Sequence, residues 1–315
     1  MISKSKNVYV AGHNGMVGSA LVRSLIKQGY NNIFTASRAE LDLTVQDAVN
    51  NFFKENNIEI VFNAAAKVGG IVGNQEMPGD FIHQNILIQS NIIDACLKNN
   101  VERHIFLGSC CIYPKFCDQP MKEDFLLTGE LEPTNEPYAV AKISGIISCQ
   151  ALHKQYKLKS VCPMPINLYG PGDNFHPKHS HVIPGLMRRI HEAKVSGIDE
   201  VTVWGTGEVK REYMHVDDCA SGIIYVADLF EAGEMINIAP GTELTTRQTA
   251  ELISEVFGYK GKLVQDLSKP DGTPRKYACS ERIKQEGWKP SIDLKEGLQE
   301  TYQWYLENVA KKNSE

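Results

Sequence analysis

The stretch Asn7-Val8-Tyr9-Val10-Ala11-Gly12-His13-Asn14-Gly15-Met16-Val17-Gly18-Ser19 decides the fold. Residues 7–11 have the pattern of a short buried strand, and an amphipathic segment over residues 19–28 predicts a helix. Between them, Gly12 permits a tight turn, Gly15 lets backbone N–H groups approach a pyrophosphate, and Gly18 lets the helix pack closely on the strand. The N-terminus of the helix adds partial positive charge. We therefore predict a dinucleotide-binding turn; the plain alternative is an ordinary Gly-rich turn between a strand and a helix.

The end of the second predicted strand, residues 33–36, indicates which dinucleotide binds. An NAD site usually places Asp or Glu there to hold the ribose hydroxyls, but this chain has Ser37 and Arg38. The planar guanidinium of arginine grips a phosphate through two hydrogen bonds, so we predict NADP(H). Asp42 lies where such folds often place a side chain near the adenine, although it could equally cap a helix that begins near Val45.

Strands are predicted at residues 7–11, 33–36, 60–63, 104–108 and 160–164, with helical segments between them. This alternation predicts an α/β protein with a Rossmann-type, doubly wound parallel sheet. Beyond about Pro171, proline and glycine divide the chain into short elements, which predicts a smaller α/β substrate lobe. We expect residues 1–170 to form the NADP-binding domain, and residues 171–315 to form mainly the substrate lobe, with some segments returning to the first domain. Ligands should then bind beyond the carboxyl ends of the strands, between the lobes.

The composition narrows the class of protein. Of 315 residues, 42% are hydrophobic and 23% are charged, which is ordinary for a globular protein. The net charge of −5 argues against binding to nucleic acid or to a membrane surface. Without an apolar leader or an apolar stretch of membrane-spanning length, we expect a cytoplasmic enzyme. The eight cysteines contain no C-x-x-C pair, so we predict neither a metal site nor a disulfide framework.

Tyr138 and Lys142 lie four residues apart in a segment, residues 138–156, that predicts a helix, so they share one face. A lysine cation beside a tyrosine favours the phenolate and should lower the tyrosine pKa. Ser109 follows the strand at residues 104–108, where its hydroxyl can face the cleft. Taken singly, the pair fits a solvated helix face and the serine fits a turn. In this order after the glycine turn, the three residues predict an acid that protonates a reduced carbonyl.

This set resembles the short-chain dehydrogenase/reductase superfamily, in its extended branch that acts on nucleotide sugars. Further motifs resemble the GDP-L-fucose synthase family, and the resemblance runs from about residue 8 to residue 305. They are residues 12–19, 64–71, 173–177 and 268–276 together with Pro133-Thr134-Asn135-Glu136-Pro137-Tyr138-Ala139, Asn167-Leu168-Tyr169-Gly170-Pro171 and His215-Val216-Asp217-Asp218.

The resemblance implies conversion of GDP-4-keto-6-deoxy-D-mannose to GDP-L-fucose, by epimerisation at C3 and C5 and then NADPH-dependent reduction of the C4 ketone. Ser109 and Tyr138 would donate to the ketone oxygen and stabilise an enolate. The family's epimerisation pair falls on Cys111 and His181, which would flank the sugar as base and acid. On residue type alone, Cys111 fits a buried structural thiol, and His181 a surface or metal-binding histidine beside two more histidines.

The resemblance also implies the binding residues. The nucleotide-diphosphate would contact Arg189, Trp204 and Arg211; Asp271 would bind sugar or nucleotide, although its Pro-Asp-Gly context equally fits a turn. A homodimer is implied, through a four-helix bundle of the helices near residues 80–99 and 138–156. The cofactor would contact Gly12, His13, Asn14, Gly15, Met16, Val17, Gly18, Arg38, Asp42, Ala65, Leu107, Gly108, Lys142, Pro165, Asn167, Leu168 and His181.

Three residues depart from the family pattern: Cys110 replaces a frequent serine, Ile166 a frequent threonine, and Asn14 a residue that is basic in some relatives. The nearest competing interpretation is a sugar 4-epimerase or 4,6-dehydratase of the same branch. Dehydratases place Asp-Glu beside the catalytic hydroxyl residue, where this chain has Cys110-Cys111. A catalytically silent NADPH-sensing protein is a second alternative, against which the intact Ser109, Tyr138 and Lys142 argue.

Overall fold

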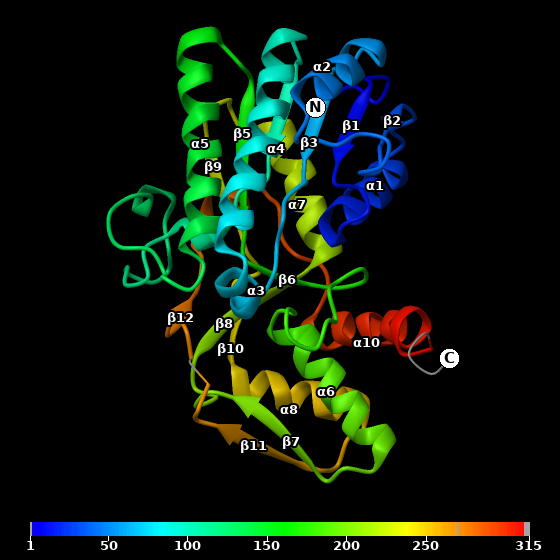
Figure 1. Ribbon diagram of the computed structural model, residues 1–315, viewed down its shortest axis with the longest axis vertical. Coiled ribbons are helices and arrows are strands. Elements are labelled where there is room, and N and C mark those ends of the chain that lie inside the picture. The colour runs from blue at the N-terminus through cyan, green and yellow to red at the C-terminus, as the bar shows by residue number, and fades with distance from the viewer. Residues whose placement is uncertain (1, 270, 312–315) are drawn as a thin grey trace.

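The computed structural model describes residues 2–269 and 271–311, and its larger layer is a six-stranded sheet in which every pair of neighbours is parallel (Figure 1). The strand order is β2-β1-β3-β4-β5-β9, so the chain leaves β1 toward β2 and then returns to the other side of β1 with β3. This reversal is the switch point at which open α/β sheets bind ligands. The strands are β1 (Val8–Ala11), β2 (Ile33–Phe34), β3 (Ile60–Asn63), β4 (Arg103–Phe106), β5 (Ser160–Pro165) and β9 (Met235–Ile238).

Helices cover both faces of this sheet. On one face α4 (Pro78–Lys98) packs between α2 (Gln46–Glu55) and α5 (Glu136–Tyr156), and on the other α1 (Met16–Lys27) packs against α7 (Val216–Leu229) (Figure 1). The predicted α/β, doubly wound parallel sheet is therefore confirmed. Gly145 permits the close packing of α5, because a Cβ there would lie 2.3 Å from the Phe106 ring.

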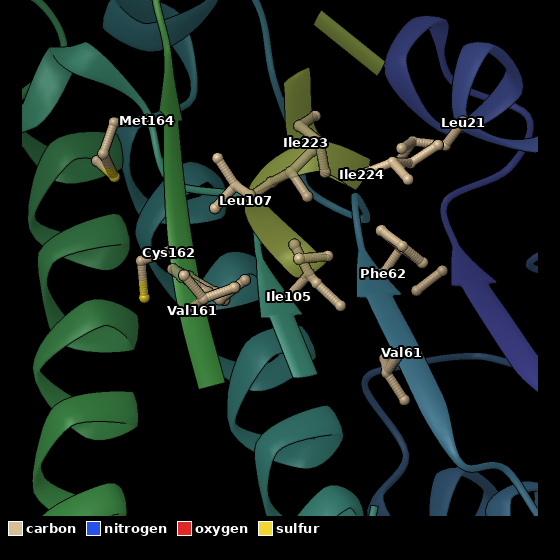
Figure 2. Close-up of a cluster of buried hydrophobic side chains, with 14 of the residues drawn as sticks. Leu21, Val61, Phe62, Ile105, Leu107, Val161, Cys162, Met164, Ile223 and Ile224 are labelled. Carbon is tan, nitrogen blue, oxygen red and sulfur yellow. The ribbon is translucent and has the colours of Figure 1, made fainter. Parts of the chain in front are cut away.

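The main core fills the space between the sheet and its helices. Phe62 of β3, Ile105 of β4 and Val161 of β5 lie among side chains of α1 and α7, including those of Leu21, Ile223 and Ile224 (Figure 2). Val61, the residue before Phe62 in β3, is buried on the other face of the sheet. Strands covered on both faces need apolar residues in succession rather than in alternation. This explains why the strand segments read as continuous apolar runs.

A second lobe has its own small core. Its main sheet joins β6 (Asn167–Tyr169), β8 (Lys210–His215), β10 (Glu243–Thr245) and β12 (Arg275–Lys276), and a separate parallel pair joins β7 (Glu200–Trp204) to β11 (Lys262–Asp266). The helices α6 (Val182–Ser196), α8 (Thr246–Phe257) and α10 (Leu294–Tyr305) bury Leu186, Ile190, Ile253, Phe257 and Leu298 between them. The later part of the chain also supplies α7 and β9 to the first sheet. The domain boundary near residue 170 stays a prediction.

Several predicted boundaries shift. The first helix begins at Met16 rather than at residue 19, because its N-cap is Gly15 inside the glycine turn. The fourth strand ends at Phe106, two residues early, and the second at Phe34. Pro270, part of one resembling motif, lies outside the described residues. The short elements are α3 (Ile71–Glu76), α9 (Glu281–Gln285), η1 (Cys110–Ile112), η2 (Glu123–Phe125) and η3 (Leu306–Ala310).

No helix within residues 2–269 and 271–311 combines the length and the apolar character needed to cross a membrane.

Candidate functional site

One cavity of about 820 Å³ joins the carboxyl ends of β1, β3, β4 and β5 to the second lobe. Every site residue predicted from the sequence lines it, although these residues are spread over more than 250 positions of the chain. Its walls include the glycine turn with Ala65, Leu107, Gly108, Pro165, Asn167 and Leu168, the residues Ser109, Cys111, Tyr138, Lys142 and His181, and the residues Arg189, Trp204, Arg211 and Asp271.

The glycine turn has the shape that a phosphate group needs. Gly12 has a φ of +79°, and a Cβ there would lie 2.8 Å from the backbone of Ala65. A Cβ at Gly18 would lie 2.1 Å from the Gly12 carbonyl oxygen. Gly15, the N-cap of α1, brings no capping side chain, so the first N–H groups of the helix can bind an anion. The cradle fits a dinucleotide pyrophosphate.

Arg38 and Asp42 lie at the adjacent rim of the cavity. Within the described part of the chain the exposed Arg38 guanidinium has no hydrogen bond or salt bridge, so it fits a 2′-phosphate. The Asp42 carboxylate accepts hydrogen bonds from Thr44 N at 2.9 Å and Thr44 Oγ1 at 2.7 Å, which hold its pKa below the usual range. The N-cap of α2 is Val45, so Asp42 shapes the turn before this helix and does not cap it.

Ser109, Tyr138 and Lys142 lie together on one wall of the cavity, but the pKa of Tyr138 does not shift in the predicted direction. Burial raises the pKa of Tyr138, a nearby thiol adds to the rise, and a hydrogen bond with Ser109 only partly opposes it. The Lys142 Nζ instead donates to the Leu107 carbonyl oxygen at 2.7 Å and lies 5.9 Å from the centre of the Tyr138 ring. Burial lowers the pKa of Lys142 to about 8. The prediction that Lys142 lowers the tyrosine pKa is therefore wrong here, because desolvation exceeds any effect of the lysine.

Cys111 is the second residue of the short helix η1, whose N-cap is Ser109, and its backbone N–H donates to Ser109 Oγ at 3.2 Å. The Lys276 Nζ lies 3.6 Å from the Cys111 Sγ. Burial alone would raise the pKa of this thiol, but the Lys276 cation and hydrogen bonds with Ser109, Lys276 and Asn135 lower it below its ordinary value. By contrast, burial raises the pKa of the neighbouring Cys110 thiol, whose Sγ lies 3.4 Å from the Met164 carbonyl oxygen. The pKa values of the two adjacent thiols are therefore shifted in opposite directions.

His181 is the N-cap of α6, and its ring is exposed to the cavity rather than to the outer surface. The enclosing walls lower its pKa, and the Lys276 cation lowers it further. Of its two neighbouring histidines, His179 donates from Nε2 to the Glu76 carboxylate at 2.9 Å and stacks on His176. Among the described residues no cluster of three potential ligands could hold a metal ion.

The far end of the cavity carries cations around an exposed indole. The Arg189 guanidinium lies 5.0 Å and the Lys269 Nζ 5.7 Å from the Trp204 ring centre. Arg211 comes from β8 on the opposite wall. The Asp271 carboxylate accepts hydrogen bonds from Thr206 N at 2.8 Å and from Thr206 Oγ1. This pairing favours a turn-holding role for Asp271 over direct contact with a ligand.

Sequence reasoning did not identify Lys276 and Asn135 as site residues, although both stand in the motifs that carry the resemblance. Lys276 is brought to Cys111 across the lobe boundary, a contact that no local pattern indicates. The buried Asn135 Oδ1 has no partner among the described residues, and Asn135 lines the same cavity as Cys111. A polar residue directly before the Tyr138 helix was the available signal.

The chain matches the model of the NAD dependent epimerase/dehydratase family over residues 8–239. It is 54% identical over 310 residues to a protein of Oryza sativa subsp. japonica named "Probable GDP-L-fucose synthase 1", covering 98% of this chain and 94% of that protein. It is 50% identical over 312 residues to "GDP-L-fucose synthase" of Escherichia coli (strain K12), covering 96% and 97%. A solved structure of a GDP-L-fucose synthetase from Naegleria fowleri bound to NADP superposes with a TM-score of 0.88 at 25% identity, covering 98% and 97%.

Proposed function

The chain belongs to the NAD-dependent epimerase/dehydratase family, and we propose that within it the chain converts GDP-4-keto-6-deoxy-D-mannose to GDP-L-fucose with NADP(H). The reaction epimerises C3 and C5 of the sugar and then reduces the C4 ketone. One observation carries the proposal. Ser109, Tyr138 and Lys142, which suit carbonyl reduction, line the same cavity as the thiol of Cys111, the imidazole of His181 and the glycine turn that fits a dinucleotide. Relatives named for this activity match nearly the whole chain.

Epimerisation uses the groups around Cys111. Protons next to a ketone are acidic because the resulting enolate is stabilised by hydrogen bonds to the ketone oxygen, which Ser109 and Tyr138 donate. Cys111, whose pKa is lowered, removes such a proton as the thiolate, and His181 returns one to the opposite face. The two steps together invert one carbon. Cys111 then gives its proton to solvent and His181 takes one from solvent, and the steps are repeated at the second carbon.

Reduction uses the wall formed by Tyr138 and Lys142. When bound in the cradle, NADPH would supply the hydride, and Tyr138 would give its proton to the oxygen that receives negative charge. The raised pKa of Tyr138 keeps the phenol protonated at neutral pH, as a proton donor requires. Lys142, with a pKa near 8 and a fixed hydrogen bond to Leu107, is placed to return a proton to this wall after turnover.

The nucleotide end of the substrate binds at the second lobe. Arg189 and Arg211 hold the diphosphate, since guanidinium groups match phosphate oxygens, and Trp204 offers an exposed apolar face to the base. Burial lowers the pKa of both arginines without removing their charge at neutral pH. The sugar then lies between Cys111 and His181.

The same proposal includes a cytoplasmic homodimer in which α4 and α5 form the contact. Val140 and Ile147 leave 38% and 41% of their surface exposed on α5, which supports an apolar interface. Ile93 of α4 and Ile143 of α5 are only 3% and 8% exposed and pack in the core of their own subunit. Light scattering at micromolar concentration should give twice the chain mass, and a monomer would remove this part of the proposal.

Turnover with the named substrate tests the function. The purified protein is given GDP-4-keto-6-deoxy-D-mannose and NADPH, and loss of NADPH absorbance is compared with the amount and stereochemistry of product by NMR. One NADPH should be consumed for each GDP-L-fucose formed. A 4-epimerase would consume none, and a silent sensor would bind NADPH without turnover; either result would overturn the proposal.

A further inference from the structure

Lys276 is fixed between the two lobes by contacts on both sides. Its strand β12 pairs with β8, where Lys276 lies opposite Arg211, and Arg275 beside it forms two hydrogen bonds of 2.7 and 2.8 Å with Glu243. The following residues dock on the first lobe, where Met121 N donates to the Tyr277 carbonyl oxygen at 2.7 Å. The backbone that carries Lys276 is therefore held in place, and its ammonium group has a defined position.

Among residues 2–269 and 271–311, the Cys111 thiol is the group that pairs with the Lys276 ammonium. The ammonium group is partly buried, and the described residues give it no salt bridge; its hydrogen bond is to the Cys111 Sγ at 3.6 Å. A buried or half-buried lysine is normally paired with a carboxylate. The cation therefore acts on groups that line the cavity: it lowers the pKa of Cys111 and of His181, and it partly opposes the rise that burial causes in the pKa of Cys110.

The other charges near these two groups are different for each. Besides Lys276, the groups that interact electrostatically with Cys111 are Cys110, Tyr138 and Arg211. The cavity wall around His181 includes Lys178, and the next residue, His179, pairs with Glu76. The N-terminus of α6 adds partial positive charge at His181. Lys276 is the cation whose field reaches both Cys111 and His181.

We propose that Lys276 is a third catalytic residue of the epimerisation, whose ammonium group contacts the Cys111 sulfur and holds it as the thiolate base. This inference rests on the proposed function for its substrate, but the contact with the Cys111 thiol does not. No bond is formed or broken at Lys276: the C–H proton goes to the Cys111 sulfur, and the proton that replaces it comes from the His181 imidazolium.

A positive charge favours the deprotonated form of both groups, so its removal should raise the pKa of Cys111 and that of His181 together. Epimerisation needs thiolate and imidazolium, so its rate rises with pH as Cys111 ionises and falls as His181 loses its proton. Without the Lys276 charge, both limbs of the profile should move to higher pH. A merely structural role would lower the rate without moving the two limbs in the same direction.

The first measurement needs no substrate. Iodoacetamide alkylation of the protein is followed by peptide mass spectrometry at several pH values, because only the thiolate reacts. The partly exposed Cys117, near Asp118, serves as the internal reference. In the wild-type protein Cys111 should reach half-maximal reactivity at a lower pH than Cys117. In Lys276→Gln the Cys111 midpoint should rise by about one unit or more, a roughly tenfold loss of thiolate at neutral pH, while Cys117 is unchanged.

Lys276→Arg keeps the charge and should keep the midpoint near that of wild type. An unshifted Cys111 midpoint in Lys276→Gln would overturn the inference. If that variant does not fold, shown by alkylation of the buried Cys219, the wild-type comparison decides: a Cys111 midpoint at or above that of Cys117 overturns it. Deuterium exchange of the keto sugar is the second measurement. If the Cys111 midpoint rises in Lys276→Gln but the keto sugar takes up no deuterium, the proposed function is refuted and the Lys276–Cys111 contact still stands.

Discussion

Gly18→Ala tests the dinucleotide cradle through its packing. The added Cβ would lie 2.1 Å from the Gly12 carbonyl oxygen, 2.6 Å from its carbonyl carbon and 2.9 Å from the His13 Cα. All three are backbone atoms, so no side chain can rotate away. A carbon and an oxygen in contact lie roughly 3.3 Å apart, about the lower edge of van der Waals contact. The turn and the start of α1 must therefore separate by about 1 Å.

The structural cost follows from this displacement. Overpacking of this kind typically costs about 1–3 kcal/mol of stability. With an unfolding entropy of about 2 cal/mol/K per residue, this lowers the Tm by roughly 2–5 °C. The cofactor should lose at least one hydrogen bond from the displaced N–H groups to a charged phosphate, which is worth about 1.5–3 kcal/mol. We expect the Kd for NADPH to rise by about ten- to a hundredfold.

Fluorescence titration with NADPH and thermal unfolding measure the two effects. Gly79→Ala is the matched control, because Gly79 lies in the first turn of α4 and a Cβ there meets no atom within 4 Å. The control should bind NADPH as the wild type does and unfold at the same or a slightly higher temperature. Wild-type affinity together with wild-type Tm in Gly18→Ala would show that the turn is not packed on α1 as described.

Two further predictions concern the reduction and the choice of cofactor. Tyr138→Phe removes the proton donor and leaves the phosphate contacts, so kcat for reduction should fall by about 10²–10⁴-fold while the Kd for NADPH stays near that of wild type; near-native turnover in a stopped assay would contradict the role of Tyr138. Arg38→Asp removes a phosphate partner and adds a repelling charge, so the Kd for NADPH should rise far more than the Kd for NADH. An equal rise in both constants, measured by titration, would show that Arg38 does not contact the 2′-phosphate.

Local sequence patterns were sufficient for the sheet and the cofactor cradle. The glycine spacing and the apolar runs are short-range signals, and they placed β1, β3 and α5 within a residue or two of their observed bounds. Boundaries shifted where the backbone is set by the turn itself, as at Met16, whose helix begins inside the glycine motif.

The electrostatics of the site depend on contacts between distant segments and on burial. The Tyr138–Lys142 spacing was visible, but the direction of the tyrosine pKa shift depends on burial and on the Leu107 carbonyl that holds the lysine. The Cys111–Lys276 contact joins positions 165 residues apart. It is produced by the docking of residues 275–279 on the first lobe, which no periodicity in the sequence encodes.

Deuterium uptake by the sugar tests the central claim most directly. GDP-4-keto-6-deoxy-D-mannose is incubated with the protein in deuterated buffer without NADPH, and mass spectrometry counts the exchanged positions. The wild-type protein should introduce deuterium at C3 and C5. Cys111→Ser should block this exchange, because a serine hydroxyl is a much poorer base than a thiolate, while slow reduction of the unepimerised ketone continues when NADPH is added. Full uptake at both carbons in Cys111→Ser would contradict the account and make Cys111 a structural thiol.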